Sequence, residues 1–412
     1  MPPPWVVIPG DIGCSKSFTL ISVPTRQGFR WTPPGGLGLR CVGSNGGWLA
    51  GAYIAADRTV RIVLVNPLTG ARVEAPPAGR VSFMPDPERH KYKVEDALSV
   101  AVQKVAFSPN PTAQDFAVAV VGVSRVSRDS REGPAARFGD DVGWYAPRAS
   151  REGPAASFGV AFARAGDDGW CAWAELPDQR DRSAGLDVAY RDGKFYYMTV
   201  SGELWVVDMA APSPKPAKLA TFPRATLDDG RRGYHLGFSG DGALHVVSSN
   251  TDDASRLYVL TQWHDDPSFG LPAEGVPPWT RARQLRGQAF LVGDFNQTLC
   301  APVPDGSACL RPDSVYFFTG VPLCSGLAKY SYSYREREVG RDGVGVRRLD
   351  LITGTFQRPV RTRKIRFRPI LDFWQPAWSS RYKDDLLEEE TWNRLKLGLD
   401  WTKAIWFMPS MR

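Results

Sequence analysis

Histidine is scarce in this chain, and its cysteines lack the spacing that metal sites use. Four histidines stand among 412 residues, and none of the six cysteines belongs to a C-x-x-C pair. Zinc sites need closely spaced Cys and His ligands, and Ser-His-Asp or Cys-His catalysis needs a histidine that a motif singles out. The sequence therefore predicts no metal site, no cofactor and no enzymatic activity.

Long apolar runs are absent as well, and so is a secretory signal. The opening stretch MPPPWVVIPG has no basic residues ahead of an apolar region, as a signal peptide would. No apolar run approaches the roughly 18 residues of a membrane span. We therefore expect no membrane partner, a cytoplasmic or nuclear location, and reduced thiols.

Basic residues are in excess but do not form one arm. The formal net charge is +7, and the residues that carry it are spread along the chain, so nucleic acid is not the expected partner. The densest basic run is 361–368, where strand alternation would place Lys364, Arg366 and Arg368 on one face. This run is interpreted either as a docking patch for an acidic partner or nuclear localisation signal, or as a solvated strand edge.

Turn residues and aromatic residues are what the chain has in plenty. It contains 40 Gly and 34 Pro, with 14 Trp, 13 Tyr and 20 Phe. Segment 185–208 reads as three short strands joined at Asp192-Gly193 and Ser201-Gly202, and Asp-Gly favours two-residue hairpins. A fourth strand at 218–222 would lie at an edge, because the prolines before it do not fit a central strand.

Comparable units of strands and turns recur along the chain. One begins near Leu39, one contains 100–123, one spans 234–262, and one includes 288–292 and 314–318. The turn at 66–70 is echoed at 350–354. A four-stranded meander of about 40 residues is the size of a propeller blade. The fold class predicted is all-β, a single β-propeller of six four-stranded blades, with seven as the alternative.

The remaining segments complete a one-domain organisation over 1–412. Strands in 1–38 and 400–412 are predicted to share a composite closing blade, and 381–399 is predicted to be a short helix. REGPAARFG at 131 and REGPAASFG at 151 form a duplication inside an inserted loop, 124–156. We expect the part from Arg131 to Arg151 to be exposed.

Eight apolar residues at matching places in these units are predicted to lie in the interior. They are Trp48, Phe107, Val188, Phe195, Leu204, Val206, Leu244 and Val315.

The order of these segments resembles the plant KIB-type β-propeller family. The stretches SNGGWLAG, VLVNPLTGARVEAPP, KVAFSPNPT, DVAYRDGKFYYMTVSGELWVVD and IWFMPS carry the resemblance, which runs from about Trp5 to Ser410. In that family the propeller is often F-box-associated and presents a substrate to a ubiquitin ligase. The sequence before Trp5 is too short for an F-box, so we do not expect a Skp-type adaptor as a partner.

The resemblance implies a non-catalytic propeller that binds an unidentified protein, like the substrate-recognition part of an F-box ubiquitin-ligase adaptor. The alternative is an enzyme or small-molecule-binding propeller with its site in the central channel. Aromatic and arginine side chains in loops are the usual anchors of protein interfaces. The candidate partner-binding residues are Arg131, Trp144, Tyr145, Arg151, Trp263, Trp279, Lys364, Arg366 and Arg368.

Overall fold

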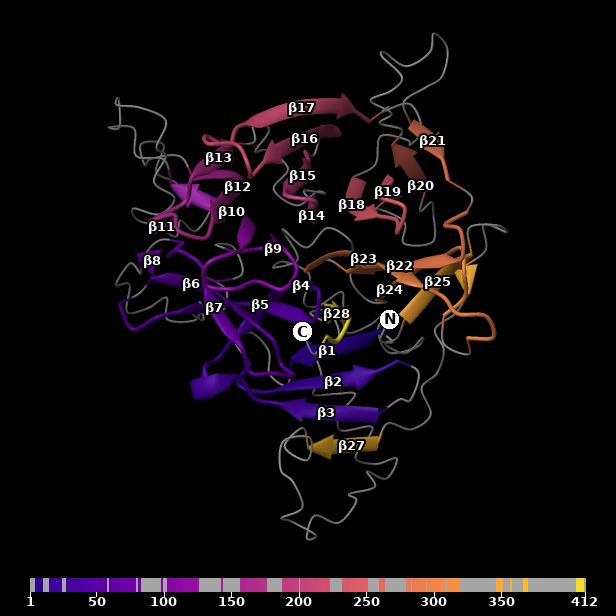
Figure 1. Cartoon of the computed structure of the whole chain (residues 1–412), viewed down its shortest axis with the longest axis horizontal. Helices are drawn as coiled ribbons and strands as arrows, with labels where there is room; N and C mark the ends of the chain where they lie inside the picture. Colours follow the sequence, from indigo (N-terminus) through magenta and orange to yellow (C-terminus); the bar gives the residue numbers. More distant parts are fainter. Residues whose placement is uncertain are drawn as a thin grey trace, which may run out of the picture.

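The structure is a computed structural model in which strands dominate (Figure 1). It describes residues 4–9, 15–23, 27–57, 59–78, 81–82, 98, 102–125, 142–143, 156–175, 187–199, 201–222, 232–250, 259–263, 279–282, 284–293, 295–307, 310–318, 346–350, 356–357, 366–369 and 405–410. Within these ranges no helix is long and apolar enough to cross a membrane. The predicted helix 381–399 lies outside the described residues.

One sheet joins the two ends of the chain. Its strand order is β27-β3-β2-β1-β28. The bounds are β1 Trp5–Pro9, β2 Phe18–Ser22, β3 Gln27–Trp31, β27 Arg366–Pro369 and β28 Ile405–Phe407. The C-terminal strand β28 runs antiparallel to β1, with Trp5 opposite Phe407. Strands from opposite ends of the sequence therefore share hydrogen bonds.

Three four-stranded antiparallel sheets follow, each built from segments close in sequence. The first contains β4 Arg40–Asn45, β5 Trp48–Ile54, β6 Val60–Val65 and β7 Arg72–Glu74. The second contains β9 Lys104–Phe107, β10 Ala117–Arg125, β12 Ala156–Arg164 and β13 Ala172–Glu175. The third contains β14 Asp187–Arg191, β15 Lys194–Met198, β16 Glu203–Asp208 and β17 Pro216–Thr221.

Two further groups are linked by a single parallel pair, Gly237 with Thr298. The first group is β18 Arg232–Phe238, β19 Leu244–Asn250, β20 Val259–Trp263 and β21 Trp279–Arg281. The second is β23 Asn296–Pro302, β22 Gln288–Gly293, β24 Ser314–Phe318, β25 Val346–Asp350 and β26 Phe356–Gln357. Gly237 is required at this contact, because a Cβ there would lie 2.8 Å from the Thr298 Cγ2 atom.

The sheets stand radially about a common centre, each with one inner strand next to it (Figure 1). Each inner strand contacts the next around a ring formed by β28, β4, β9, β14, β18 and β23. Apolar side chains fill the space between neighbouring sheets; for example, Phe162 packs on Phe195 with ring centroids 5.7 Å apart. This all-β architecture is a β-propeller, as predicted.

The hairpin predicted at Asp192-Gly193 is present in the structure. Asp192 and Gly193 both have positive φ, 48° and 80°, between paired residues Arg191 and Lys194. Pro216 opens β17, an outer edge strand whose position does not need its missing N–H.

Some of the sequence predictions need correction. Of the eight predicted core residues seven are buried, but Val206 is only partly buried. Strands β21 (Trp279–Arg281) and β23 (Asn296–Pro302) lie outside the strand segments named in the sequence prediction. Of the segment 131–151, the structure describes only β11 (Val142–Gly143), whose backbone pairs in parallel with β8 (Val81–Ser82).

Candidate functional site

The predicted partner-binding residues are not brought together among the described residues. Arg131, Trp144, Tyr145, Arg151 and Lys364 lie outside those residues. For three more, only the backbone is described: Trp263 is in β20, and Arg366 and Arg368 are in β27.

Trp279 is described, and its prediction as an exposed loop residue is wrong. It lies in β21 and is 6% exposed. Its indole nitrogen donates to the Thr221 carbonyl at 3.1 Å, and its ring meets Phe222 edge-on at 5.1 Å between centroids. The surrounding core contains Phe222, Tyr234 and Leu204. Trp279 therefore packs one sheet against the next, because apolar partners lie on both sides of it.

The inner strands all run in the same direction, so the propeller has two distinct faces. Arg40 at the start of β4 donates to Val102 just before β9, and Asn45 at the end of β4 donates to Phe107 at the end of β9. We call the end where inner strands stop the turn face. It carries the turns 46–47, 192–193 and 239–243 and the segment 284–287. The opposite face carries the β5–β6 turn, 55–59.

A buried ion pair holds the starts of two inner strands together near the opposite face. The Lys104 ammonium on β9 pairs with the Asp187 carboxylate on β14, and both side chains are nearly inaccessible. Asp187 also accepts from the backbone N–H of Leu236 on β18 at 2.6 Å and from that of Val188 at 2.8 Å. One carboxylate therefore connects three neighbouring inner strands.

His235 on β18 lies beside this pair and is 4% exposed. Burial lowers the pKa of its imidazole to about 3, and the charge of Lys104 acts in the same direction. The ring is therefore neutral at physiological pH, because a second buried cation next to Lys104 would be unfavourable.

Polar side chains also connect inner strands to one another, both across the centre of the ring and between adjacent strands. The Gln297 side chain on β23 accepts from the Tyr190 backbone N–H on β14 at 3.1 Å, although β18 lies between these two strands in the ring. Ser44 donates to the Trp406 carbonyl, and the Asn296 carboxamide oxygen accepts from the Trp406 N–H at 3.3 Å. These bonds satisfy inner-edge backbone groups that would otherwise be unpaired.

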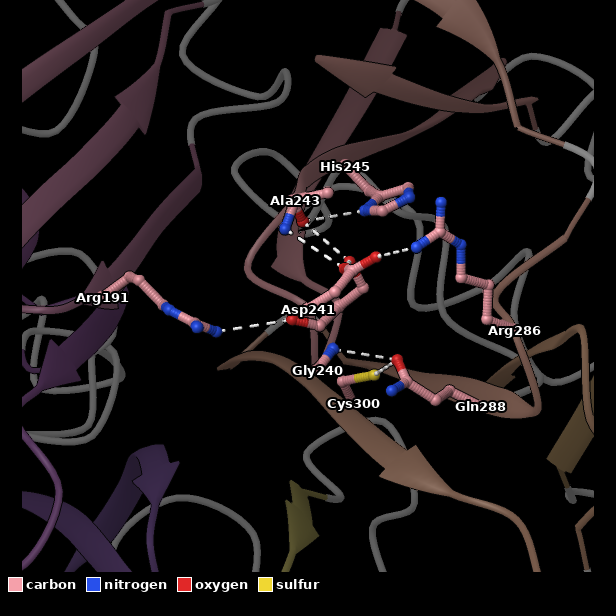
Figure 2. Close-up of polar contacts among 9 residues, drawn as sticks. Arg191, Gly240, Asp241, Ala243, His245, Arg286, Gln288 and Cys300 are labelled. Atoms are coloured by element: carbon pink, nitrogen blue, oxygen red, sulfur yellow. Dashed lines mark hydrogen bonds and ion pairs between the residues drawn. The ribbon is translucent and has the colours of Figure 1, made fainter. Parts of the chain in front are cut away.

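The turn face carries a different network, centred on Asp241 (Figure 2). One Asp241 oxygen accepts from Ser239 and from the Ala243 N–H, and the other pairs with Arg286 at 3.0 Å. The Ser239 hydrogen bond is the main cause of a lowered pKa at Asp241, so this carboxylate stays ionised.

Two further contacts tie this turn to the neighbouring sheets (Figure 2). Gln288 on β22 accepts from the Gly240 N–H at 2.9 Å, and Arg191 at the end of β14 donates to the Ser239 carbonyl at 3.4 Å. The 239–243 turn is thus fixed from both sides, which makes this part of the turn face a firm polar surface.

Metal ligation and thiol chemistry can be checked among the described residues. Among the described residues, no group of three His, Cys, Asp or Glu side chains could hold a metal ion. Burial raises the pKa of the Cys41 and Cys300 thiols to about 12 and that of Cys171 to about 11. These thiols remain protonated, and the thiolate is the nucleophilic form.

Lys104, Asp187 and Arg286 were not among the residues predicted from the sequence to form a site. The first two offered a signal, since each opens a strand whose next residues are apolar. A charged residue in such a place is seldom left without a partner. Nothing local in the sequence indicated that the two would meet, because 83 residues separate them (187 − 104).

Comparison with known proteins identifies a family over most of the chain. A sequence model described as "KIB1-4 beta-propeller" matches residues 20–346. A search of curated proteins found no match.

Solved structures resemble the chain only distantly. AztD from Citrobacter koseri is 10% identical, with 88% of this chain and 83% of that one covered and a TM-score of 0.33. A putative 6-phosphogluconolactonase from Bacteroides uniformis is 10% identical, with coverages of 86% and 94% and a TM-score of 0.34. YCF48 from Cyanidioschyzon merolae is 15% identical at a TM-score of 0.26; 60% of this chain is covered, and the match spans 57% of that protein. Likenesses this weak carry no argument about function.

Proposed function

Because the chain belongs to the KIB1-4 beta-propeller family, we propose that it is a non-catalytic propeller of six blades that binds another protein. The proposed blades are the N- and C-terminal sheet, the three four-stranded sheets, and the groups β18–β21 and β22–β26. The role is similar to that of the substrate-recognition part of F-box ubiquitin-ligase adaptors.

This proposal rests on what the polar side chains of the inner strands contact. Asp187, Gln297, Asn45 and Ser44 each bond to the backbone of another inner strand. Lys104 is neutralised by Asp187, and His235 is held neutral. A catalytic channel needs polar groups directed at a substrate. These groups instead hold the ring of inner strands together.

The turn face is the surface that we propose for the partner. Its 239–243 turn is joined by hydrogen bonds to Arg191 at the end of β14 and to Gln288 on β22, so little conformational entropy would be lost on binding. It presents exposed charged side chains, including Asp192 and Arg286 at 81% and 79% exposure. A rigid scaffold with exposed loops is the usual arrangement of a recognition surface.

Site-specific photo-crosslinking tests this function. A photoreactive residue would replace Asp192 or Asp305 on the turn face, where Asp305 follows the end of β23 and its segment bonds to Gly287. Asp57 on the opposite face is the matched control, and all three residues are exposed. In an extract of the source organism, we expect a discrete, saturable protein adduct from the two turn-face positions and none from position 57. An adduct from position 57 alone, or none that saturates, would contradict the proposal.

A further inference from the structure

Arg286 has a backbone conformation that its side chain does not favour. Four described non-glycine residues have positive φ, namely Asn110, Asp192, Arg286 and Asp313, and Arg286 has φ 51°. Asn and Asp tolerate this left-handed region because their short side chains bond locally, but arginine does not. Such strain persists only where surrounding contacts impose it, and it concentrates at functional sites.

Contacts on both sides of Arg286 hold this conformation. The N–H of Leu285 donates to the Asp313 carboxylate, and the N–H of Gln288 donates to the Leu285 carbonyl at 3.1 Å. Gln288 in turn bonds to Gly240. The chain could have used asparagine or glycine here at lower cost, so the arginine side chain has to be explained by what it contacts.

The side chain is exposed yet oriented. Its Nη1 atom donates to Asp241 Oδ2 at 3.0 Å, while 79% of the side chain is accessible and Asp241 is 41% accessible. Figure 2 shows the guanidinium on one side of the 239–243 turn and Arg191 on the other. Among the described residues this is the one hydrogen bond of the Arg286 guanidinium. Its Nε and Nη2 donors therefore form a free, pre-oriented edge.

We propose that Arg286 binds a carboxylate in an acidic segment of the protein partner, through its Nε and Nη2 donors. This inference rests on the proposed function and names the partner chemistry. A planar carboxylate matches a guanidinium edge with two parallel hydrogen bonds. A phosphate dianion fits less well, because the Asp241 carboxylate beside the guanidinium would repel its second charge.

Arg286→Asn separates a binding role from a structural one. Asparagine tolerates positive φ, so the unfolding temperature should stay the same or rise. The probe is an array of 15-residue peptides with a central Glu, together with matched arrays carrying Gln or phosphoserine there. The intact chain should bind a subset of the Glu peptides, lose them in the Gln array, and bind them at least tenfold more weakly as Arg286→Asn. Arg61→Asn, which alters the Asp57–Arg61 pair on the opposite face, is the control and should bind unchanged.

Each other result overturns this inference. A lowered unfolding temperature for Arg286→Asn would make the residue structural, and equal affinity would remove it from the interface. Stronger binding to phosphoserine peptides, or none to Glu peptides, would refute the carboxylate. The proposed function is tested separately, because the crosslinks at positions 192 and 305 do not depend on Arg286.

Discussion

At the scale of single residues, His235 makes stability depend on pH. Its pKa is about 3 in the folded chain against an ordinary value of 6.5, so below pH 6.5 the unfolded chain takes up a proton that the folded chain refuses. Stability should therefore fall as the pH drops from 6.5 towards 3, by up to about 1.4 kcal/mol per pH unit from this group. Urea unfolding of the native chain and of His235→Gln at several pH values measures how the free energy of unfolding depends on pH. The variant should have the shallower slope; equal slopes would mean that His235 is protonated when folded.

A substitution at Gly43 tests how closely the inner strands β4 and β9 approach each other. A Cβ at this position on β4 would meet the Val105 carbonyl oxygen on β9. Because that atom is backbone, it cannot rotate away, so Gly43→Ala should destabilise the chain by at least about 1–3 kcal/mol. Gly169→Ala is the control, since a Cβ there has no atom within 4 Å. Denaturant midpoints that shift equally in both variants would contradict the close packing of β4 on β9.

At the scale of elements, β28 closes the ring. All three of its residues are buried, and the Trp406 indole N–H donates to the Val292 carbonyl at 2.9 Å. Trp406→Phe leaves that carbonyl buried without its donor, which should cost about 1–3 kcal/mol in addition to the lost ring volume. Amide exchange should then quicken in 405–410 and in β22 before it does in β14–β17.

Trp205→Phe is the matched control for this element. Trp205 is only partly buried, and its indole donates to Glu203 at 3.4 Å on the same strand. The change should leave the unfolding midpoint nearly unaltered, because water can replace that contact. If Trp406→Phe were equally mild, β28 would not be an essential closing strand.

At the scale of the whole molecule, the propeller should be stable without a bound ion. Two of its described turn carboxylates are hydrogen-bonded within their own turns: Asp57 accepts from the Thr59 N–H at 3.0 Å, and Asp241 accepts from Ser239. We expect neither EDTA nor added Ca²⁺ or Zn²⁺ to change the unfolding temperature, since a ligand raises it only by binding the folded state. A rise in the unfolding temperature on adding metal would contradict this prediction and favour the alternative of a small-molecule or enzymatic site at the centre of the ring.

The sequence by itself determined the local structure. Asp192-Gly193 specifies a tight turn because both residues accept positive φ. The apolar residues that alternate in the segments around Phe195 and Leu204 specify strands, each with one face that must be buried. The family could also be identified from the order of such segments. These features depend on residues a few positions apart, so local preferences are enough to specify them.

Only the tertiary structure decided which strands line the centre of the ring and which distant side chains become neighbours. β23 became an inner strand although nothing in its own sequence favours that place, and Trp279 was buried by Phe222 and Thr221, more than 50 residues earlier. The Lys104–Asp187 pair arises in the same way, from a neighbour on another sheet, and Arg286 meets Asp241, which lies 45 residues earlier. Ring closure brings together side chains far apart in sequence, and their mutual burial and charge then fix positions that no local preference specifies.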